Sequence, residues 1–371
     1  MQINPLQPIR LGQLRHCIIS VILFREASTE AHPTPTIRMN PALETLILAL
    51  APEHGLTLSL ETLFIGAEPH PNIPPETIGW QPLKPKATAW ENAGFNRIDE
   101  LETKIWPLIL ILPGKSRDET LTWFATARKH LAPNGTIVVA MANTAGAGRF
   151  EKQFEKATGK VTSIQKNKCR AFFATQDNNW DETLFEQWHA LGTPSPIGDS
   201  KFITQAGIFS NDHIDPGSQL LADHFPKNIR GNIADLGAGW GFLSDSALQS
   251  NPNINRINLF EADSRALDCA RKNLASHSTE IHFHWHDVIQ GLPDTYDAII
   301  MNPPFHSGQS TDVDLGKAFI TTAVQSLRRG GRLFIVANRQ LPYETLLDSL
   351  KLRWQKPAET PIYKLLFASK P

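Results

Sequence analysis

The chain has 371 residues of ordinary globular composition, 41% hydrophobic and 20% charged, which is too long for most single cores and predicts two domains. Its net charge of −1 excludes nucleic-acid affinity based on global charge, so such affinity would need a local basic surface. The three scattered cysteines form no CxxC pair, which argues against a disulfide framework or a zinc site and suits a reducing cytoplasm.

The first 38 residues hold the candidate membrane or targeting segment, CIISVILF at Cys17–Phe24. Its eight apolar residues are far fewer than the roughly 20 that span a bilayer. Arginines precede the segment as in a signal peptide, but Arg25, Glu26 and Glu30 follow it at once, without a clear small-x-small cleavage site. We therefore favour residues 1–38 as an extension outside the fold, with Met39 as the natural start, over secretion.

Helical and strand-like segments alternate between residues 39 and 176. LETLILAL and residues 120–131 have helical patterns, whereas TLFIGA, WPLILILP and TIVVAMA have strand patterns, with PNG as a turn before the last. Continuous apolar runs such as WPLILILP are typical of strands buried in a parallel sheet. The alternation predicts an α/β fold.

Regular patterning fades between residues 177 and 206, apart from a possible short helix at 184–191. GTPSPIGDS has the proline, glycine and serine content of a linker. From residue 207 a second α/β pattern begins, with strand candidates in IADLGAGWG, INLFEAD, IHFHWHD, DAIIMNPPF, RLFIVAN and YKLLFASK.

The two halves resemble each other. LAPNGTIVVAMAN at 131–143 matches LRRGGRLFIVAN at 327–338, and an apolar strand precedes each. However, the first half has Leu112-Pro113-Gly114 where the second has Asn302-Pro303-Pro304, and it lacks a glycine-rich turn. We predict two α/β domains of common architecture, the first without chemistry. Coincidental similarity of two unrelated α/β domains is the alternative.

The segment DLGAGWG places Asp235, Gly237, Gly239 and Gly241 between a strand and a helix. Glycines allow a sharp turn and a close approach of a ligand to the backbone. Asp235 would repel a pyrophosphate, whereas it would attract the α-amino group of S-adenosylmethionine (SAM). The spacing is also GxGxG rather than the GxGxxG of dinucleotide sites. The turn therefore favours SAM.

Acidic residues follow the next two strands as well. Glu261 can accept hydrogen bonds from both ribose hydroxyls, and Asp287 can accept one from the adenine amine. Asp263 either contacts the ligand or caps the following helix, and Asp287 could also be an ordinary loop residue. Three acids after three successive strands strengthen the prediction of SAM. The predicted cofactor set also includes their neighbours Ala238, Ala262 and Val288.

His282, His284 and His286 alternate with apolar residues and share one face of a predicted strand. Because no second group of ligands lies nearby in the sequence, we expect a half-buried strand and no metal.

The segment MNPPFHSG directly follows the apolar run DAII. An exocyclic amine on a heteroaromatic ring is a poor nucleophile, and two acceptors aimed at its N–H bonds would favour the pyramidal geometry of attack. Asn302 can offer its side-chain carbonyl and Pro303 its backbone carbonyl, while Pro304 stiffens the turn. Phe305 can stack on a planar substrate, and His306 lines the entrance or takes the proton. The segment predicts an amino-methyltransferase site; a purely structural proline turn is the alternative.

Together with GIFSNDHIDPGSQLL at 207–221 and IVANRQLPY at 335–343, these motifs resemble the bacterial ribosomal RNA guanine-N(2) methyltransferases, both the methyltransferase C type of the small ribosomal subunit and the methyltransferase G type of the large one. The likeness is strong from Phe202 to the end and only architectural over 41–176. It implies SAM-dependent methylation of a guanine amine in ribosomal RNA. It also implies that the residues Phe209, Asp215 and Gly217 help to close the pocket, although a helix start at Asp215 is an equal alternative.

The predicted fold class is therefore α/β, with two tandem Rossmann-like class I methyltransferase domains. The first, residues 39–176, lacks the SAM motifs, and a linker at 177–206 joins it to the catalytic domain at 207–371. We expect a cytoplasmic monomer that acts on ribosomal RNA or a ribosomal subunit, with no membrane partner.

Basic residues are concentrated at 149–170, a stretch that contains seven Lys or Arg and only two Glu. A solvated helix face explains Lys152 and Lys156. The predicted RNA contacts are Lys160, Lys166 and Lys168, on a first domain kept as an RNA platform. Arg328, Arg329 and Arg332 form a smaller basic cluster.

Three alternatives remain open on the sequence. The same chemistry could methylate a protein glutamine or a DNA adenine, although NPP followed by phenylalanine and histidine argues against the first and no DNA-recognition domain is evident. The chain could also be an inactive SAM-fold RNA-binding protein.

Overall fold

The structure is a computed structural model that describes residues 40–371, except residues 55, 57–60, 102 and 305–309. CIISVILF and the extension expected at 1–38 lie outside the described residues, as do Phe305 and His306. Within the described part of the chain, no helix is both long enough and apolar enough to cross a bilayer.

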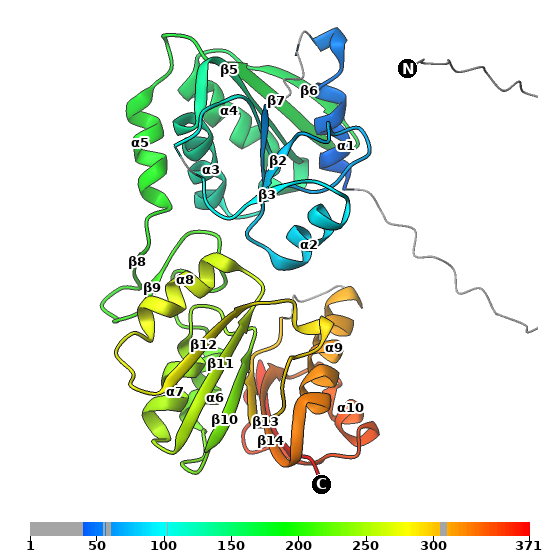
Figure 1. Cartoon of the computed structure of the whole chain (residues 1–371), viewed down its shortest axis with the longest axis vertical. Coiled ribbons are helices and arrows are strands. Elements are labelled where there is room, and N and C mark those ends of the chain that lie inside the picture. Colours follow the sequence, from blue (N-terminus) through cyan, green and yellow to red (C-terminus); the bar gives the residue numbers. More distant parts are fainter. Residues whose placement is uncertain (1–39, 55, 57–60, 102, 305–309) are drawn as a thin grey trace, which may run out of the picture. The chain divides into compact units, whose positions relative to one another are not determined.

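The first sheet in the described residues has seven strands in the order β3-β2-β1-β4-β5-β7-β6 (Figure 1). The strands are β1 (Thr62–Ile65), β2 (Ile78–Trp80), β3 (Arg97–Ile98), β4 (Trp106–Ile111), β5 (Leu131–Ala142), β6 (Thr162–Lys166) and β7 (Cys169–Thr175). β1 to β5 pair in parallel, and β7 runs antiparallel to β5 and β6. The apolar runs predicted as buried strands in this half are confirmed.

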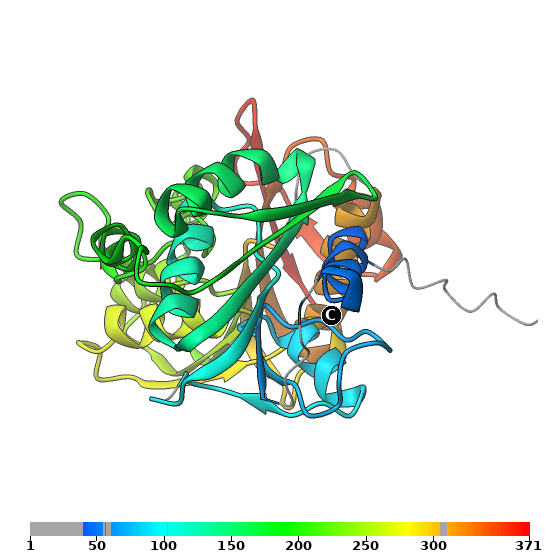
Figure 2. The same cartoon turned by 90° about the horizontal axis from the view of Figure 1, so that it is seen from above.

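Helices cover both faces of this sheet. They are α1 (Pro41–Ala49), η1 (Pro52–His54), α2 (Lys84–Asn92), α3 (Arg117–Lys129), η2 (Asn143–Ala145), α4 (Ala147–Thr158) and α5 (Glu182–Leu191). α1 and α2 pack on the face that carries Phe64 and Leu110, whereas α3, α4 and α5 pack on the face of Ile65 and Ile109. Figure 2 shows α1, in blue, on one side of the sheet and the blue-green α3 on the other. Because both faces are covered, the central strands β1 and β4 are buried at nearly every position and are almost continuously apolar, whereas the edge strand β6 is largely exposed and polar.

The segment predicted as a linker, 177–206, carries more structure than expected. The short helix predicted at 184–191 is confirmed as α5, and the side chain of Asp181 caps its first turn. Phe185 and Trp188 are buried in the core of the first domain, where Trp188 packs edge-on against Phe124 with ring centroids 6.0 Å apart. The glycine and proline residues that mark a linker lie only after α5, where β8 (Ser195–Pro196) pairs with β9 (Ile203–Thr204).

The second sheet in the described residues has the strand order β12-β11-β10-β13-β14-β16-β15. Its strands are β10 (Gly231–Leu236), β11 (Ile254–Glu261), β12 (Glu280–Trp285), β13 (Tyr296–Met301), β14 (Leu327–Asn338), β15 (Arg353–Gln355) and β16 (Tyr363–Ser369). The helices are α6 (Pro216–Asp223), α7 (Phe242–Ser250), α8 (Ser264–Asn273), η3 (Val288–Gln290), α9 (Ser310–Ser326) and α10 (Tyr343–Ser349). α6, α7 and α8 cover one face, and α9 and α10 cover the other (Figure 1).

The two sheets repeat the same plan. Each has five parallel strands followed by an antiparallel pair, in the same spatial order. Even an irregularity recurs: the register between β4 and β5 shifts between Trp106 and Leu108, and that between β13 and β14 shifts between Tyr296 and Ala298. The predicted common architecture of two tandem Rossmann-like domains is thus confirmed.

Candidate active site

A cavity of about 660 Å³ lies at the carboxyl ends of β10, β11 and β13. In open α/β sheets, ligands bind at this edge because the loops that follow the parallel strands converge there. Many predicted site residues line it: Phe209, Asp215, Gly237, Ala238, Gly239, Glu261, Ala262, Asp287, Val288, Asn302, Pro303 and Pro304. The structure therefore brings the glycine turn and the Asn-Pro-Pro corner to one cavity.

The glycine turn follows β10 directly. Gly237 and Gly239 have φ values of 68° and 54°, in the left-handed region that favours glycine. The N–H of Gly239 donates to Glu261 Oε2 at 2.8 Å, which ties the turn to the end of β11. Gly241 does not line the cavity; it is the N-cap residue of α7, with a φ of 91°, and a Cβ there would lie 3.3 Å from the side chains of Ala270 and Leu274. The predicted ligand contact of Gly241 stays a prediction.

Asp235 does not reach the cavity wall. Its side chain is fully buried, and its Oδ2 accepts a hydrogen bond from Ser244 Oγ at 2.7 Å. Its Oδ1 has no partner among the described residues, and burial raises the pKa of Asp235 to about 7, with a further contribution from the nearby charge of Glu261. Because Asp235 still belongs to β10, its side chain points toward α7 rather than forward into the cavity. The structure gives no support to its predicted contact with the α-amino group.

Glu261 lies at the cavity wall with both carboxylate oxygens fixed. Oε2 accepts from the N–H of Gly239, and Oε1 accepts from the N–H of Asp263 at 2.9 Å. Burial raises the pKa of Glu261, and these backbone N–H groups oppose that rise. Each carboxylate oxygen can accept a second hydrogen bond, so Glu261 can still receive two hydroxyls.

Asp263 and Asp287 differ in their surroundings. Asp263 caps α8 and forms an ion pair with Arg265 at 2.7 Å, but it does not line this cavity. The structure therefore supports the helix cap for Asp263 rather than the ligand contact. Asp287 does line the cavity, while its side chain also accepts from the N–H of Ile289 at 3.3 Å. A contact of Asp287 with an adenine stays a prediction.

Asn302 is held in one orientation. Its Nδ2 donates to Asp215 Oδ2 and to Ser218 Oγ, each at 2.9 Å, and the N–H of Ser218 donates to the same Asp215 oxygen at 2.7 Å. Asn302 Oδ1 is buried and has no partner among the described residues. Since both neighbours of the amide nitrogen accept hydrogen bonds, the opposite end of the amide is left as an acceptor for a ligand.

The structure supports the helix start at Asp215, whereas the part of Asp215 in closing the pocket stays a prediction. Asp215 caps α6, whose first residue is Pro216, and it binds the amide of Asn302. Gly217 does not line the cavity, but a Cβ there would lie 2.8 Å from the ring of Tyr363, so glycine is needed for this packing. Ser218 was not predicted from the sequence, because nothing local connects it to a residue 84 positions away.

Phe209 stands at the cavity wall with 60% of its surface exposed. The buried Trp240 donates its indole N–H to the carbonyls of Phe209 and Ser210, at 3.2 and 3.3 Å. An exposed aromatic ring is thus carried on an anchored backbone.

The first domain also contributes to this cavity, which the sequence did not predict. Its lining residues from that domain are Leu83, Pro85 and Lys86. The N–H of Lys84 donates to the carbonyl of Ala262 at 2.8 Å, next to Glu261. The indole of Trp285 donates to the carbonyls of Pro82 and Ala262, at 2.9 and 2.8 Å. The loop after β11 is therefore supported by both domains.

The three histidines around β12 have protein partners. His282, His284 and His286 form hydrogen bonds with Glu280, Asn258 and Gly291, respectively. The described residues contain no group of three or more His, Cys, Asp or Glu that could hold a metal ion.

The lysines predicted to contact RNA lie away from this cavity. Lys160, Lys166 and Lys168 are exposed, and Lys166 and Lys168 stand at the tip of the β6–β7 hairpin. The backbone of Lys168 accepts from the N–H of Asn143, so this tip lies at the carboxyl end of β5. In the smaller basic cluster, Arg328 pairs with Asp297 at 3.0 Å, which reduces its free charge.

Comparisons with known proteins match these observations. Residues 199–367 match the family model of the methyltransferase small domain. The ribosomal RNA small subunit methyltransferase C of Shewanella amazonensis is 30% identical over 246 residues, which cover 65% of this chain and 71% of the relative. The protein of the same name from Psychromonas ingrahamii is 29% identical over 268 residues, covering 71% and 76%.

A solved structure is also similar along nearly the whole chain. It is the T. thermophilus 16S rRNA N2 G1207 methyltransferase in complex with AdoMet and guanosine, with a TM-score of 0.74 and 20% sequence identity. The match covers 90% of this chain and 93% of the other. At this identity the likeness establishes the shared two-domain fold.

Proposed function

Since the chain belongs to the ribosomal RNA small subunit methyltransferase C family, we propose that it transfers a methyl group from SAM to the exocyclic amine of a guanine in small-subunit ribosomal RNA. The observation that carries this proposal is the fixed amide of Asn302. Its free acceptor lies in the same cavity as the glycine turn and the Glu261 carboxylate.

The residues around the cavity fit SAM. Glu261 and Asp287 place carboxylates at the wall, where they suit ribose hydroxyls and an adenine amine, and the glycine spacing is GxGxG rather than the GxGxxG of dinucleotide sites. The cation at this wall, Lys86, is engaged by Glu68 at 2.6 Å. When bound, SAM supplies a methyl group that is activated by its sulfonium charge.

The protein's own task is to hold and orient the amine. Asn302 Oδ1 can accept one N–H bond of a guanine amine, which favours a pyramidal nitrogen with its lone pair free to react. Asp215 and Ser218 fix that acceptor before the substrate arrives, so little ordering is needed during the reaction. The second acceptor, the carbonyl of Pro303, remains a prediction. So do the roles of Phe305 and His306, outside the described residues.

Methylation mapping tests this function directly. Labelled SAM is incubated with the protein and free RNA, each ribosomal subunit, whole ribosomes or DNA, and the labelled nucleotide or amino acid is identified. We expect the label on a guanine amine of the small-subunit RNA, and Asn302→Ala should abolish it while SAM still binds in calorimetry. Label on a protein glutamine or a DNA adenine, or SAM binding without transfer to RNA, would support one of the alternatives.

The exposed lysines on and just before the β6–β7 hairpin offer a docking surface for the RNA outside the cavity. We propose that Lys160, Lys166 and Lys168 contact phosphates, which requires their positive charge but no base recognition. Replacing all three by glutamine should weaken RNA binding and flatten its salt dependence, with SAM affinity unchanged. Lys129→Gln is the control variant. Lys129 is exposed at the end of α3, near the amino end of β5, whereas the hairpin tip lies at the carboxyl end of the same strand. Unchanged RNA binding in the triple variant would contradict the platform.

We also propose that the protein acts as a monomer in the cytoplasm, where ribosomal subunits are found. Equilibrium sedimentation of the full chain tests the monomer.

A further inference from the structure

A second surface adjoins the active site on the side of β14 and β16. We call residues 338–341 and 358–363 the β14–β16 rim. β14 pairs with β13, the strand that ends before Asn302, and the last residue of β14, Asn338, lies opposite Tyr363. The ring of Tyr363 packs on Gly217, two residues after Asp215. Burial and the charge of Asp215 raise the pKa of Tyr363, in keeping with this proximity. The rim thus borders the group that holds Asn302.

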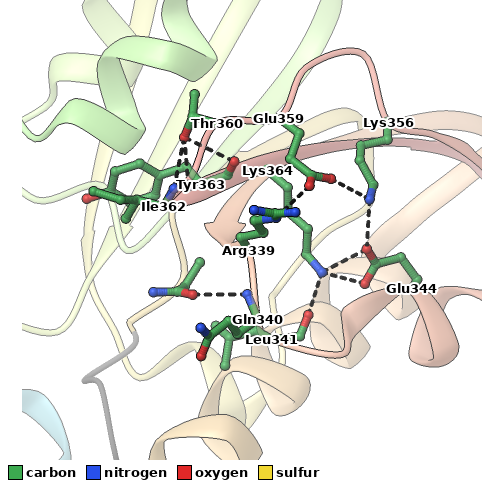
Figure 3. Close-up of polar contacts among 11 residues, drawn as sticks. Arg339, Gln340, Leu341, Glu344, Lys356, Glu359, Thr360, Ile362, Tyr363 and Lys364 are labelled. Atoms are coloured by element: carbon green, nitrogen blue, oxygen red, sulfur yellow. Dashed lines mark hydrogen bonds and ion pairs between the residues drawn. The ribbon is translucent and has the colours of Figure 1, made fainter.

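The ion pair of a buried lysine with the partly exposed Glu344 fixes the base of this rim (Figure 3). Lys364 is 3% exposed, and its Nζ donates to both oxygens of Glu344, at 2.7 and 2.6 Å, and to the carbonyl of Leu341 at 2.6 Å. The desolvation of such a pair offsets much of its Coulomb attraction, so it adds little net stability. Its clear effect is geometric, because it ties the segment after β14 to β16.

Backbone bonds fix the upper part of the rim. The N–H of Arg339 donates to the carbonyl of Ile362 at 2.7 Å. Thr360 accepts from the N–H of Tyr363 through its hydroxyl at 2.9 Å, and its own N–H donates to the carbonyl of Tyr363 at 2.7 Å (Figure 3). The side chains on this turn are therefore presented on a rigid support.

The rim exposes an unusual combination of side chains. Ile362 is 59% exposed, although it is a large apolar residue. Next to it, Arg339 and Gln340 are exposed, and the side chain of Arg339 pairs with Glu359 at 2.7 Å. An ion pair this exposed is weak, so a phosphate can replace Glu359 at little cost. An unstacked RNA strand offers phosphates and exposed bases. A guanidinium can bind a phosphate of such a strand, and an apolar side chain beside it can contact a base or ribose.

We propose that the β14–β16 rim binds the RNA strand next to the methylated guanine, with Arg339 on a phosphate and Ile362 against a neighbouring nucleotide. This rests on the proposed function, because the strand is that of the substrate. The rim lies on the catalytic domain beside Asn302, so it positions the target, whereas the β6–β7 lysines add general affinity.

Two variants of the full chain test the rim, Arg339→Gln and Ile362→Ser, singly and together. Two matched controls are used. Arg353→Gln changes an exposed arginine of β15, which lies opposite Ser369 at the end of the β15–β16 hairpin that is far from the rim. Ile105→Ser changes an exposed isoleucine of the first domain. The readouts are KM and kcat for methylation of small-subunit RNA, SAM affinity by calorimetry, and the salt dependence of RNA binding.

We expect the double variant to raise KM for the RNA by about ten-fold or more, with SAM affinity unchanged. Arg339→Gln alone should reduce the slope of log K against log salt by about 1, as the loss of one phosphate contact does, and Ile362→Ser should leave that slope unchanged. The controls should stay within about two-fold of the wild type.

The outcomes separate the rim from the function. If the wild type methylates RNA and the double variant matches it in KM and RNA affinity, the rim proposal is overturned and the function stands. If the wild type methylates no guanine, the proposed function fails and the rim fails with it. A loss of SAM affinity in the rim variants would mean a structural role, and would also overturn the proposal.

Discussion

Asp215→Asn should impair methyl transfer while leaving the fold and the cofactor site intact. In the wild type, the Asp215 carboxylate accepts from the amide of Asn302 at 2.9 Å and from the N–H of Ser218 at 2.7 Å. The asparagine keeps a side-chain oxygen for the helix cap, and the two residue types cap helices about equally well. Its neutral oxygen is a weaker acceptor, and its NH₂ group can face the NH₂ group of Asn302.

The expected loss of kcat follows from the hydrogen bonds that each variant removes or weakens. A hydrogen bond to a charged group contributes about 1.5–3 kcal/mol, so kcat should fall by roughly 10- to 150-fold in Asp215→Asn. Ser218→Ala removes a neutral bond of about 1 kcal/mol and should lower kcat about five-fold. Removing the acceptor itself, in Asn302→Ala, should cost at least about 100-fold.

Single-turnover methylation at saturating RNA and SAM measures these effects, with calorimetry for SAM affinity and urea denaturation for stability. Asp181→Asn is the matched control, because Asp181 caps α5 in the same way, far from Asn302 in the sequence and without contact to it. If Asp215→Asn leaves kcat within two-fold of the wild type, or if its loss appears only as weaker SAM binding, the orientation of Asn302 is not what Asp215 provides.

Three further variants probe the support of the site. Burial raises the pKa of Asp235 from 3.8 to about 7, so the stability of the wild type falls as the pH rises from about 4 to 7. In urea titrations, the stability of Asp235→Asn relative to the wild type should therefore grow by roughly 2–3 kcal/mol between pH 5 and 8. A stability difference that does not change with pH would contradict this. Trp285→Phe removes the indole N–H that donates to two carbonyls, so it should cost about 1–2 kcal/mol of stability. It should also weaken SAM binding, and a variant with full SAM affinity would show that this contact does not support the cofactor site. Lys364→Met removes charged hydrogen bonds and should destabilise the fold by about 1.5–3 kcal/mol. Adding Glu344→Leu should cost less than it does alone, and strictly additive losses in this double-mutant cycle would exclude a coupled pair.

Motifs that directly follow a strand could be placed from the sequence. The glycine turn after β10, Glu261 at the end of β11 and Asn302 after β13 all reach the same cavity, because the carboxyl ends of parallel neighbours meet at one edge of the sheet. Asp235 shows the limit of this reasoning: it precedes the end of its strand, and strand alternation turns its side chain toward α7.

Contacts between distant segments could not be predicted in this way. Ser218 and Asn302 are 84 residues apart, and Pro82 and Trp285 are 203 apart. Each contact depends on how two separately folded segments pack, which no local pattern reports. The role of Ser218 and the share of the first domain in the cofactor cavity therefore emerged only from the structure.

The first domain lacks the SAM motifs, and its corresponding edge contacts the catalytic domain. A second cavity, of about 410 Å³, lies at the carboxyl ends of β1 and β4, and Asp263 and Arg265 of the catalytic domain help to line it. Arg265 Nη1 pairs with the buried Glu119 Oε1 at 2.6 Å, and a Cβ at Gly207 would lie 2.6 Å from the Glu119 carboxyl. Asp263 in turn fixes Glu261 through its N–H. The edge that holds a cofactor in one domain thus supports the cofactor loop of the other, which explains how the fold of the first domain can be useful without its chemistry.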